Sequence, residues 1–351
     1  MKSNKKLNIM NSPHHHTNHP FLQALIATLL LLLPCGCIGE EEFDNTPTGN
    51  FEALWKIIDE QYCFLDYKHI DWDDVHRRYA PLITDDMSSA GLFEVLGNML
   101  AELKDGHVNL YSTSNMARYW DWYLDYPRNF SESLVEQYLG RDYRIAGGAK
   151  YRILDDNIGY VYYGDFSSGI GNGNMNEILS YLSICNGLII DVRNNGGGAL
   201  TYATLMAEHF TNERVLTSYI LHKTGPGHND FSTPEPIYVE PSDGIRWQKP
   251  VMLLTNRHSY SATNDFVNAM SCFPQVTLVG DKTGGGSGLP FSSELPNGWG
   301  VRFSASPHLN AQQEQIEFGI DPDVKVDMQA EDEAKGLDTI IETARKLLKN
   351  E

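Results

Sequence analysis

The sequence predicts an α/β protein whose first part is helical, and two patterns support this. From about residue 150 onward, short apolar segments alternate with amphipathic ones, which is typical of strands joined by crossover helices. Before that point, apolar residues recur about one helical turn apart. The predicted strands and crossover helices are IGYVYYGDF (158–166), GLIIDVR (187–193), PVMLLTN (250–256), VTLVGD (276–281), ALTYATLMAEHF (199–210) and SATNDFVNAMSCF (261–273).

Residues 51–104 are predicted to form an N-terminal helical domain. Apolar residues recur one turn apart in two segments, 51–62 and 88–104, and Ser88 or Ser89 is a suitable N-cap for the later helix. A third, shorter helix is predicted between these segments. The predicted order along the chain is a leader (1–37), an acidic tether (38–50), the helical domain, a core (105–328) with an aromatic insert (113–150), and a C-terminal helix (329–351).

The N-terminus has the pattern of a secretory leader. Three lysines and no acidic residue precede 13 uncharged residues, from Phe21 to Leu33. That segment is shorter than the roughly 20 apolar residues that span a bilayer, and it fits the ~7–15 residues of a signal peptide. We therefore expect the leader to be removed from the mature protein.

A cysteine after the apolar segment resembles the lipid acceptor of bacterial lipoproteins. Cys37 is the preferred acceptor because small Gly36 precedes it, whereas Pro34 directly precedes the alternative, Cys35. The acidic run after Cys37 resembles the surface-export signal of Bacteroidetes lipoproteins. The expected location is the cell envelope, as an outer-membrane lipoprotein that faces the surface or the periplasm. The alternative is a secreted protein with an acidic linker.

The charge balance excludes a nucleic-acid partner. The formal net charge is −19, and loss of the three leader lysines moves it to −22, whereas nucleic-acid binding needs a basic surface. Beyond the acceptor, Cys63, Cys185 and Cys272 have the spacing of neither a disulfide framework nor a metal site. We expect buried free thiols or one disulfide, and no metal or cofactor.

Two strand-to-helix junctions carry residues that are suited to acyl transfer. In GLIIDVRNNGGGALTY (187–202), three glycines allow positive φ and close approach to a bound group, and amides at a helix N-terminus can hold an oxyanion. In VMLLTNRHSYSATNDF (251–266), Ser259 and Ser261 follow a buried strand and precede a helix that starts near Ala262. Ser261 is therefore either an N-cap or an exposed nucleophile.

A histidine in KDGHVNLYS (104–112) is the candidate base. His107 lies where an apolar helix ends and an extended run begins. A histidine at such a turn either transfers protons or is an ordinary polar turn residue. The local sequence does not decide between them, because the answer depends on a partner elsewhere in the chain.

Five motifs in one order resemble the S41 family of serine peptidases, the tail-specific or carboxyl-terminal processing proteases. The resemblance covers roughly residues 90–328 and implies a core like the β/β/α spiral of the crotonase and ClpP superfamily. The family's serine maps onto Ser261, with Asn264 in place of the usual acidic residue. Processing proteases usually carry a PDZ domain, and the segment after DGHVNLY is too short for one. The motifs are LKDGHVNL, GLIIDVRNNGGG, LLTNRHSYSAT, VGDKTGGGSG and FGIDPDVKV.

The resemblance also implies which residue acts as the base. In the processing branch the base is a lysine, whose position is Gly286 in this chain, while Lys282 lies four residues earlier. The branch that resembles the tricorn core protease uses a histidine in the Asp-Gly-His region, and His107 matches it. A neutral imidazole is a suitable base near pH 7. We therefore expect Ser261 as the nucleophile and His107 as the general base.

The remaining catalytic roles follow from the same resemblance. The oxyanion donors would be the amides of Gly197 and Ala262. The acid that orients the histidine would be Glu317, beside the GIDPD segment, with Asp105 and Glu294 as alternatives. Tricorn-like relatives also carry a serine before the histidine, where this chain has a glycine.

The expected function is a serine endopeptidase of the cell envelope that acts on polypeptides through an acyl-enzyme. Membrane contact is expected through the lipid anchor only, and the sequence does not indicate an oligomeric state. The aromatic insert is predicted to be either a flap or wall for the substrate, or packing against the helical domain. The alternative function is a catalytically silent surface lipoprotein that binds peptide or glycan in the same cleft.

Overall fold

The structure is a computed structural model that describes residues 42–350 of the chain. The predicted leader and its acceptor, Cys37, lie outside the described residues. Residues from Phe43 onward fall in one compact unit. Within the described part of the chain, no helix is both long and apolar enough to cross a membrane.

Three helices form the N-terminal part, as predicted. Ser88 caps the third helix, because its hydroxyl accepts a hydrogen bond from the Gly91 N–H. The apolar faces of these helices share one buried core with strands of the second sheet described below, so the helices do not enclose a core of their own. They are α2 (Pro47–Gln61), α3 (Trp72–Tyr79) and α4 (Ser89–Ala101).

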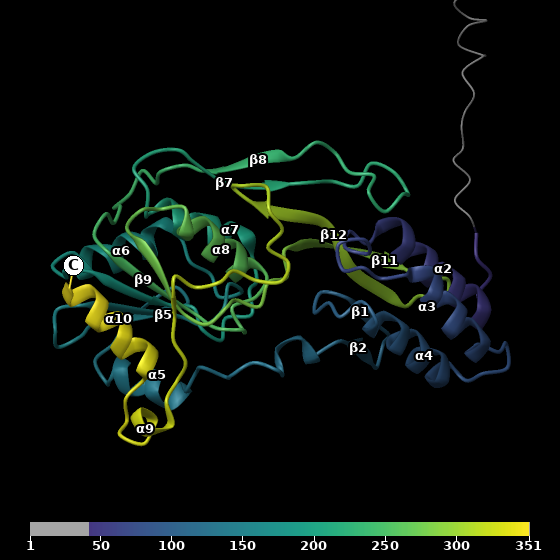
Figure 1. The fold of residues 1–351 in the computed structure, drawn as a ribbon, viewed down its shortest axis with the longest axis horizontal. Helices are drawn as coiled ribbons and strands as arrows, with labels where there is room; N and C mark the ends of the chain where they lie inside the picture. Colours follow the sequence, from purple (N-terminus) through teal and green to yellow (C-terminus); the bar gives the residue numbers. More distant parts are fainter. Residues whose placement is uncertain (1–41, 351) are drawn as a thin grey trace, which may run out of the picture. The chain divides into compact units, whose positions relative to one another are not determined.

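A seven-stranded sheet forms the α/β half (Figure 1), and its four central strands are parallel, as the apolar runs predicted. Leu188 and Ile190 face one core, whereas Ile189 faces the other, so the sheet is buried on both sides. The strand order is β13 (Val324–Lys325), β10 (Val276–Gly280), β9 (Val251–Thr255), β6 (Leu188–Asp191), β5 (Gly159–Tyr163), β4 (Ala149–Ile153) and β3 (Arg144–Ala146).

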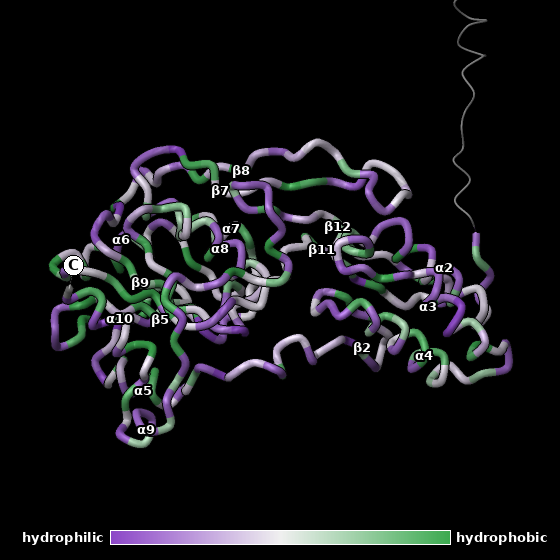
Figure 2. The backbone as a smooth tube through the Cα atoms, viewed as in Figure 1, coloured by the Kyte–Doolittle hydropathy of each residue, from purple (hydrophilic) through white to green (hydrophobic). Residues whose placement is uncertain are grey.

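Helices cover both faces of this sheet, and the hydrophobic strands between them stand out in Figure 2. One face packs against α6 (Asn172–Leu182), α7 (Leu200–Glu208) and α8 (Ala262–Ser271). The other face packs against α5 (Glu132–Leu139) and α10 (Thr339–Asn350), while the short α9 spans Ala330–Glu333. The predicted α/β fold is therefore confirmed.

A second sheet, which the sequence patterns did not predict, lies beside the N-terminal helices (Figure 1). Its long strand β12 pairs with β1 near one end and with β7 at the other. Because β1 directly follows the His107 turn, this sheet positions the candidate base. The strand order is β2 (Met116–Arg118), β1 (Asn109–Tyr111), β12 (Gly300–Asn310), β7 (Val215–Ile220) and β8 (Glu235–Val239), and β11 (Gly288–Glu294) also pairs with β12.

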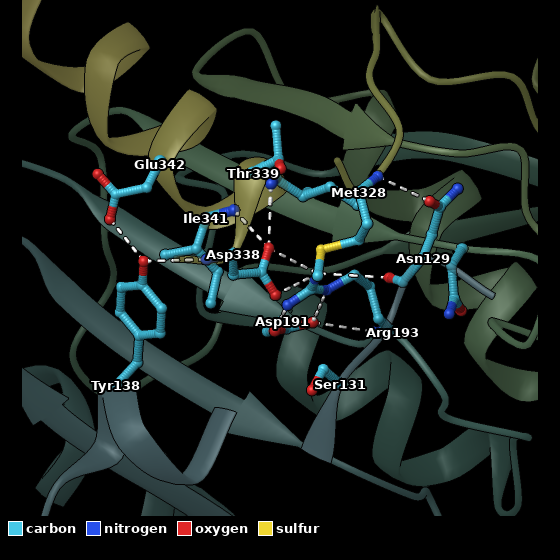
Figure 3. A network of polar contacts seen from close by, with 12 residues as sticks. Asn129, Ser131, Tyr138, Asp191, Arg193, Met328, Asp338, Thr339, Ile341 and Glu342 are labelled. Atoms are coloured by element: carbon cyan, nitrogen blue, oxygen red, sulfur yellow. Dashed lines mark hydrogen bonds and ion pairs between the residues drawn. The ribbon is translucent and has the colours of Figure 1, made fainter. Parts of the chain in front are cut away.

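A buried ionic network joins the end of β6 to the start of α10 (Figure 3). The Arg193 guanidinium donates to Asp191 at 2.7 and 2.9 Å and to Asp338 at 3.0 and 3.1 Å, and all three side chains are fully buried. Asp338 also accepts the N–H groups of Ile340 and Ile341, which caps the first turn of α10. The network therefore holds the strand that precedes the glycine turn.

We predict that Arg193→Met lowers the free energy of unfolding by about 3–5 kcal/mol, because it leaves two buried carboxylates without a counter-charge. Urea unfolding followed by circular dichroism would measure the loss. The matched control is Arg214→Met, whose pair with Glu240 is more than half exposed and should contribute about 0–1 kcal/mol. Equal losses in both variants would show that the buried network adds no stability of its own.

Candidate active site

Ser261 occupies a strained turn between β9 and α8. Its backbone has φ 59° and ψ −127°, in a region that L residues rarely adopt, at a cost of about 1–3 kcal/mol. Its N–H is held by the Gly285 carbonyl at 2.9 Å. The Ser261 side chain makes no capping hydrogen bond to α8, so its hydroxyl is free for another role.

The structure brings His107 to this hydroxyl. The distance from His107 Nε2 to Ser261 Oγ is 2.8 Å, although the two residues are 154 positions apart. His107 is buried in the turn between α4 and β1, where its N–H donates to Asp105 Oδ1 at 2.8 Å and its carbonyl accepts from Asn109. Ser259, the other candidate, is fully buried and donates to the Val192 carbonyl, which makes it a structural turn residue.

The environment keeps His107 neutral. Burial lowers the pKa of His107 to about 4; Asp105 opposes this shift, and the positive charges of Arg302 and Arg118 add to it. Near pH 7 the imidazole is therefore unprotonated and able to accept a proton from Ser261.

Glu317 does not touch His107. Its Oε1 pairs with Lys68 Nζ at 2.8 Å and its Oε2 accepts the Ser287 N–H at 2.9 Å. His107 Nδ1 is buried and has no hydrogen-bond partner among residues 42–350. Of the two alternative acids, Asp105 contacts the histidine only through the backbone, and Glu294 is exposed at the far end of β11.

Lys68 is the site residue that the sequence reasoning missed. Its ammonium also lies 3.4 Å from Asp105, and its side chain is 6 % exposed. Although burial opposes the charged form, Asp105 and Glu317 raise the pKa of Lys68 to about 12. In sequence, Lys68 sits in the segment YCFLDYKHI between two helices, where no motif marks it as a site residue.

The two carboxylates beside Lys68 differ in their protonation. Burial and the negative charge of Asp105 raise the pKa of Glu317 to about 7, against the opposing effect of Lys68. Burial also acts on Asp105, but Lys68 and His107 outweigh it and lower its pKa. Asp105 further accepts the hydroxyls of Tyr62 and Ser304 at 2.9 and 3.0 Å. Asp105 is therefore the ionised carboxylate closest to the histidine turn.

The glycine turn lies against the serine. A Cβ on Gly197 would come within 2.8 Å of Ser261 Cβ and 3.0 Å of Ala262 N, so only glycine permits this approach. The Gly197 N–H, however, donates to Asn195 Oδ1 at 3.0 Å. Among residues 42–350, the N–H groups of Gly198 and Ala262 have no hydrogen-bond partner. The structure thus offers Gly198, rather than Gly197, as the free amide beside that of Ala262.

Aromatic side chains occupy the places where this chain departs from the S41 pattern. A Cβ on Gly286, the position of the lysine base in the processing branch, would lie 2.4 Å from the Tyr260 ring. A Cβ on Gly106, the position of the tricorn-type serine, would lie 2.7 Å from Trp122 and 2.9 Å from Tyr260. Lys282 instead pairs with Asp321. One aromatic stack thus fills the space beside both glycines.

That stack includes part of the predicted aromatic insert. Trp122 stacks on Tyr260 with ring centroids 4.2 Å apart, and Tyr123 packs against His258 at the same distance. Arg257 donates to the Trp122 carbonyl. These side chains pack against the loop that carries Ser261, and a role of the insert as flap or wall for the substrate stays a prediction.

The serine and histidine face a cavity of about 350 Å³. A larger hollow of about 870 Å³, beside residues 127–133, contains neither of them. Within the described residues, no group of three histidine, cysteine or acidic side chains could hold a metal ion. The lining of the smaller cavity includes His107, Gly198, Ala199, Leu200, Thr201, Ser261, Asp265, Ser287, Leu289, Pro290, Arg302 and His308.

Comparisons with known proteins point to one family. The model of peptidase family S41 matches residues 157–326, and that of the tricorn protease C1 domain matches residues 43–101. The chain is 58% identical to a candidate peptidase from Parabacteroides merdae, with a TM-score of 0.84 over 87% of this chain and 97% of that one. The structure of mature CPAF complexed with lactacystin has the same fold, with a TM-score of 0.67 at 12% identity over 87% of this chain and 99% of that one.

Curated relatives are similar over shorter stretches. A candidate tricorn-like protease C-terminal subunit from Sulfurisphaera tokodaii is 30% identical over 169 residues, which is 46% of this chain and 18% of the relative. The chain spans between 18% and 31% of the length of the curated relatives compared.

We predict that Lys68→Met lowers the free energy of unfolding by about 3–5 kcal/mol, because Asp105 and Glu317 then share a buried site without their cation. Adding Glu317→Gln should recover part of the loss, since one of the two buried acids is removed. Thermal and urea unfolding would measure both variants.

The control for this prediction is Lys282→Met. Its pair with Asp321 is exposed and should contribute about 0–1 kcal/mol. A double variant that is less stable than Lys68→Met alone would contradict the shared-cation interpretation.

Proposed function

Because the chain belongs to peptidase family S41, we propose that it is a serine endopeptidase that hydrolyses peptide bonds through an acyl-enzyme on Ser261. The observation that carries the proposal is the 2.8 Å contact between His107 Nε2 and Ser261 Oγ. It lies within the hydrogen-bond reach that a general base needs. The strained backbone at Ser261 supports it, because strain of this kind is concentrated at functional sites.

The mechanism follows from the positions of these groups. His107 Nε2 accepts the proton of Ser261 as Oγ attacks the scissile carbonyl, and the resulting imidazolium returns the proton to the leaving amine. Water then attacks the acyl-enzyme, with His107 again as the base. We assign the donors to the oxyanion to the Ala262 and Gly198 amides, because neither N–H has a hydrogen-bond partner among residues 42–350. One such donor is typically worth about 10²–10³ in kcat.

The buried ionic cluster supports the base. Asp105 fixes the His107 turn through the backbone N–H and favours the imidazolium that forms during the reaction. We assign Glu317 an indirect role, because its carboxylate holds Lys68 and the Ser287 amide rather than the imidazole. Glu317 is thus a positioning residue.

The proposed location is the cell envelope, with the mature protein anchored through a lipid on Cys37. The support is the sequence alone: an uncharged segment of signal-peptide length followed by a cysteine and an acidic run. The substrate class is polypeptide.

We predict that Ser261→Ala, His107→Ala and the double variant lose peptidase activity by similar factors of several orders of magnitude, because members of a catalytic unit are non-additive. The assay is cleavage of a broad peptide library, read by mass spectrometry. Labelling by a fluorophosphonate should occur in the wild type and disappear in Ser261→Ala.

The control is Ser259→Ala, which alters a buried structural hydroxyl and should retain the label. Wild-type protein that neither labels nor cleaves, yet binds peptide or glycan, would establish the silent binding protein instead.

We predict that kcat/KM rises with pH through a midpoint below the ordinary histidine value of about 6.5. Below that midpoint His107 is protonated and cannot accept the serine proton; above it the free base is present. We expect the midpoint to lie below 6.5 because burial lowers the pKa of His107 to about 4. The measurement is the pH profile of kcat/KM on one peptide.

The same profile in Glu317→Gln separates two titrating groups. The pKa of Glu317 is raised to about 7, so a limb near pH 7 that vanishes in this variant belongs to the carboxyl. If a rise near pH 7 persists in Glu317→Gln, it would show that the pKa of His107 is not lowered in the active enzyme.

A further inference from the structure

We propose that Arg302, together with Arg118, forms a subsite that binds a carboxylate of the peptide substrate close to the scissile bond. The subsite belongs to the peptidase site proposed above and rests on that function. Arg302 lines the same cavity as His107 and Ser261. A substrate that reaches the serine therefore passes within reach of this guanidinium.

The register of the second sheet places the two arginines on either side of the same β1 residue. Asn109 on β1 is the Cα partner both of Arg302 on β12 and of Arg118 on β2. Residues that are paired in this way project to the same face of a sheet. Strands lie about 4.8 Å apart, so the two arginine Cα atoms are separated by about 10 Å. Side chains as long as arginine can converge over that span.

Neither arginine has a carboxylate partner in the part of the chain that the structure describes. Across residues 42–350, neither Arg302 nor Arg118 forms an ion pair, although the chain has 46 acidic and only 27 basic residues. The Arg118 Nε is buried without a hydrogen-bond partner in the described structure, and its guanidinium lies 4.4 Å from the Trp120 ring centroid. Elsewhere in this chain, Arg193 and Arg345 are each bonded to two carboxylates.

The carboxylate that the cavity does contain is already engaged. Asp265 Oδ1 lies 2.8 Å from His308 Nδ1 and pairs with it. Although burial lowers the pKa of His308, the Asp265 carboxylate raises it above its ordinary value. The charged or titratable groups that line the cavity are therefore His107, the Asp265–His308 pair and Arg302. Of these, Arg302 is the one permanent charge that is not neutralised within the described residues.

A carboxylate is the ligand that suits this arrangement. A guanidinium binds a carboxylate through two parallel N–H···O bonds, with a geometry that a neutral amide cannot reproduce. A peptide supplies this group either as an Asp or Glu side chain or as its C-terminus. The two sources have the same chemistry at the subsite.

Bound carboxylate would also help the reaction. Arg302 and Arg118 both disfavour the protonated form of His107, and the imidazolium must form as Ser261 attacks. A substrate carboxylate on these arginines offsets their charge. A substrate with a carboxylate at this position would therefore bind to the arginines and also favour the imidazolium of His107.

The test compares matched peptides on the full mature chain. Once one cleaved peptide is known from the library digest, two series are made from it: Glu against Gln at each position around the cleaved bond, with amidated ends, and free acid against amide at the C-terminus. We expect kcat/KM to favour the carboxylate form at one position by roughly 10- to 100-fold, the range for hydrogen bonds to a charged group. The responding series identifies the source of the carboxylate.

Variants assign the preference to the arginines. Arg302→Gln should reduce the acid-to-neutral ratio of kcat/KM to about one. Arg302→Lys should give an intermediate ratio, since a lysine keeps the charge without the bidentate fork. Arg118→Gln should lower the ratio as well. The control is Arg214→Gln, whose exposed partner is Glu240, and it should leave the ratio unchanged. Thermal unfolding checks that each variant is folded.

Failure of the subsite and failure of the proposed function give different results. Ser261-dependent cleavage with a ratio near one at every position would overturn the subsite and leave the peptidase intact. If the wild type cleaves nothing, fluorescence anisotropy can still measure how tightly it binds the acidic and the neutral peptide of each pair. An Arg302-dependent preference for the acidic peptide would then support it, and equal binding of both peptides would overturn it.

Discussion

The ammonium of Lys68 lies buried between Asp105 and Glu317, and three distant segments of the chain depend on it. Lys68 comes from the N-terminal helical part, Asp105 from the turn that carries His107, and Glu317 from the segment that holds the Ser287 amide. Two buried carboxylates this close to one another would be unfavourable without a cation. The position of His107, the proposed base, therefore depends on a lysine that does not contact Ser261.

The serine is held by a different set of constraints. The Tyr260 N–H donates to the Asn195 carbonyl, and the Ser261 N–H donates to the Gly285 carbonyl. Two glycine-bearing turns therefore hold the strained backbone from both sides. Arg193 anchors the strand that leads into the first of these turns. Strain at Ser261 persists because the surrounding hydrogen bonds over-determine its backbone. His107 and Ser261 thus rest on different buried networks, which meet at the 2.8 Å contact between the two side chains and where the Tyr260 ring packs against His107.

Tyr260 explains how this chain differs from other S41 patterns. Its ring fills the space in which a side chain at Gly286 would stand, and with Trp122 it fills the space beside Gly106. A lysine base at Gly286 and this tyrosine exclude one another sterically. The aromatic stack therefore leaves no room for a side chain at Gly286, whereas the His107 ring packs against it.

The sequence by itself determined the central strands and their crossover helices, because apolar periodicity is a local property. The pair His107 and Ser261 was indicated by the resemblance of five ordered motifs to the S41 family. Other features came from tertiary structure alone. Lys68 was not predictable, since its burial depends on acids far away in the chain, and β12 had no periodic signal that placed it beside β1. The Asn195 side chain decided which glycine amide stays free, and strand register placed Arg302 opposite Asn109, in the lining of the cavity that also contains His107. Apart from the contact between Asn195 and Gly197, which are two positions apart, these features depend on long-range packing, which no local pattern encodes.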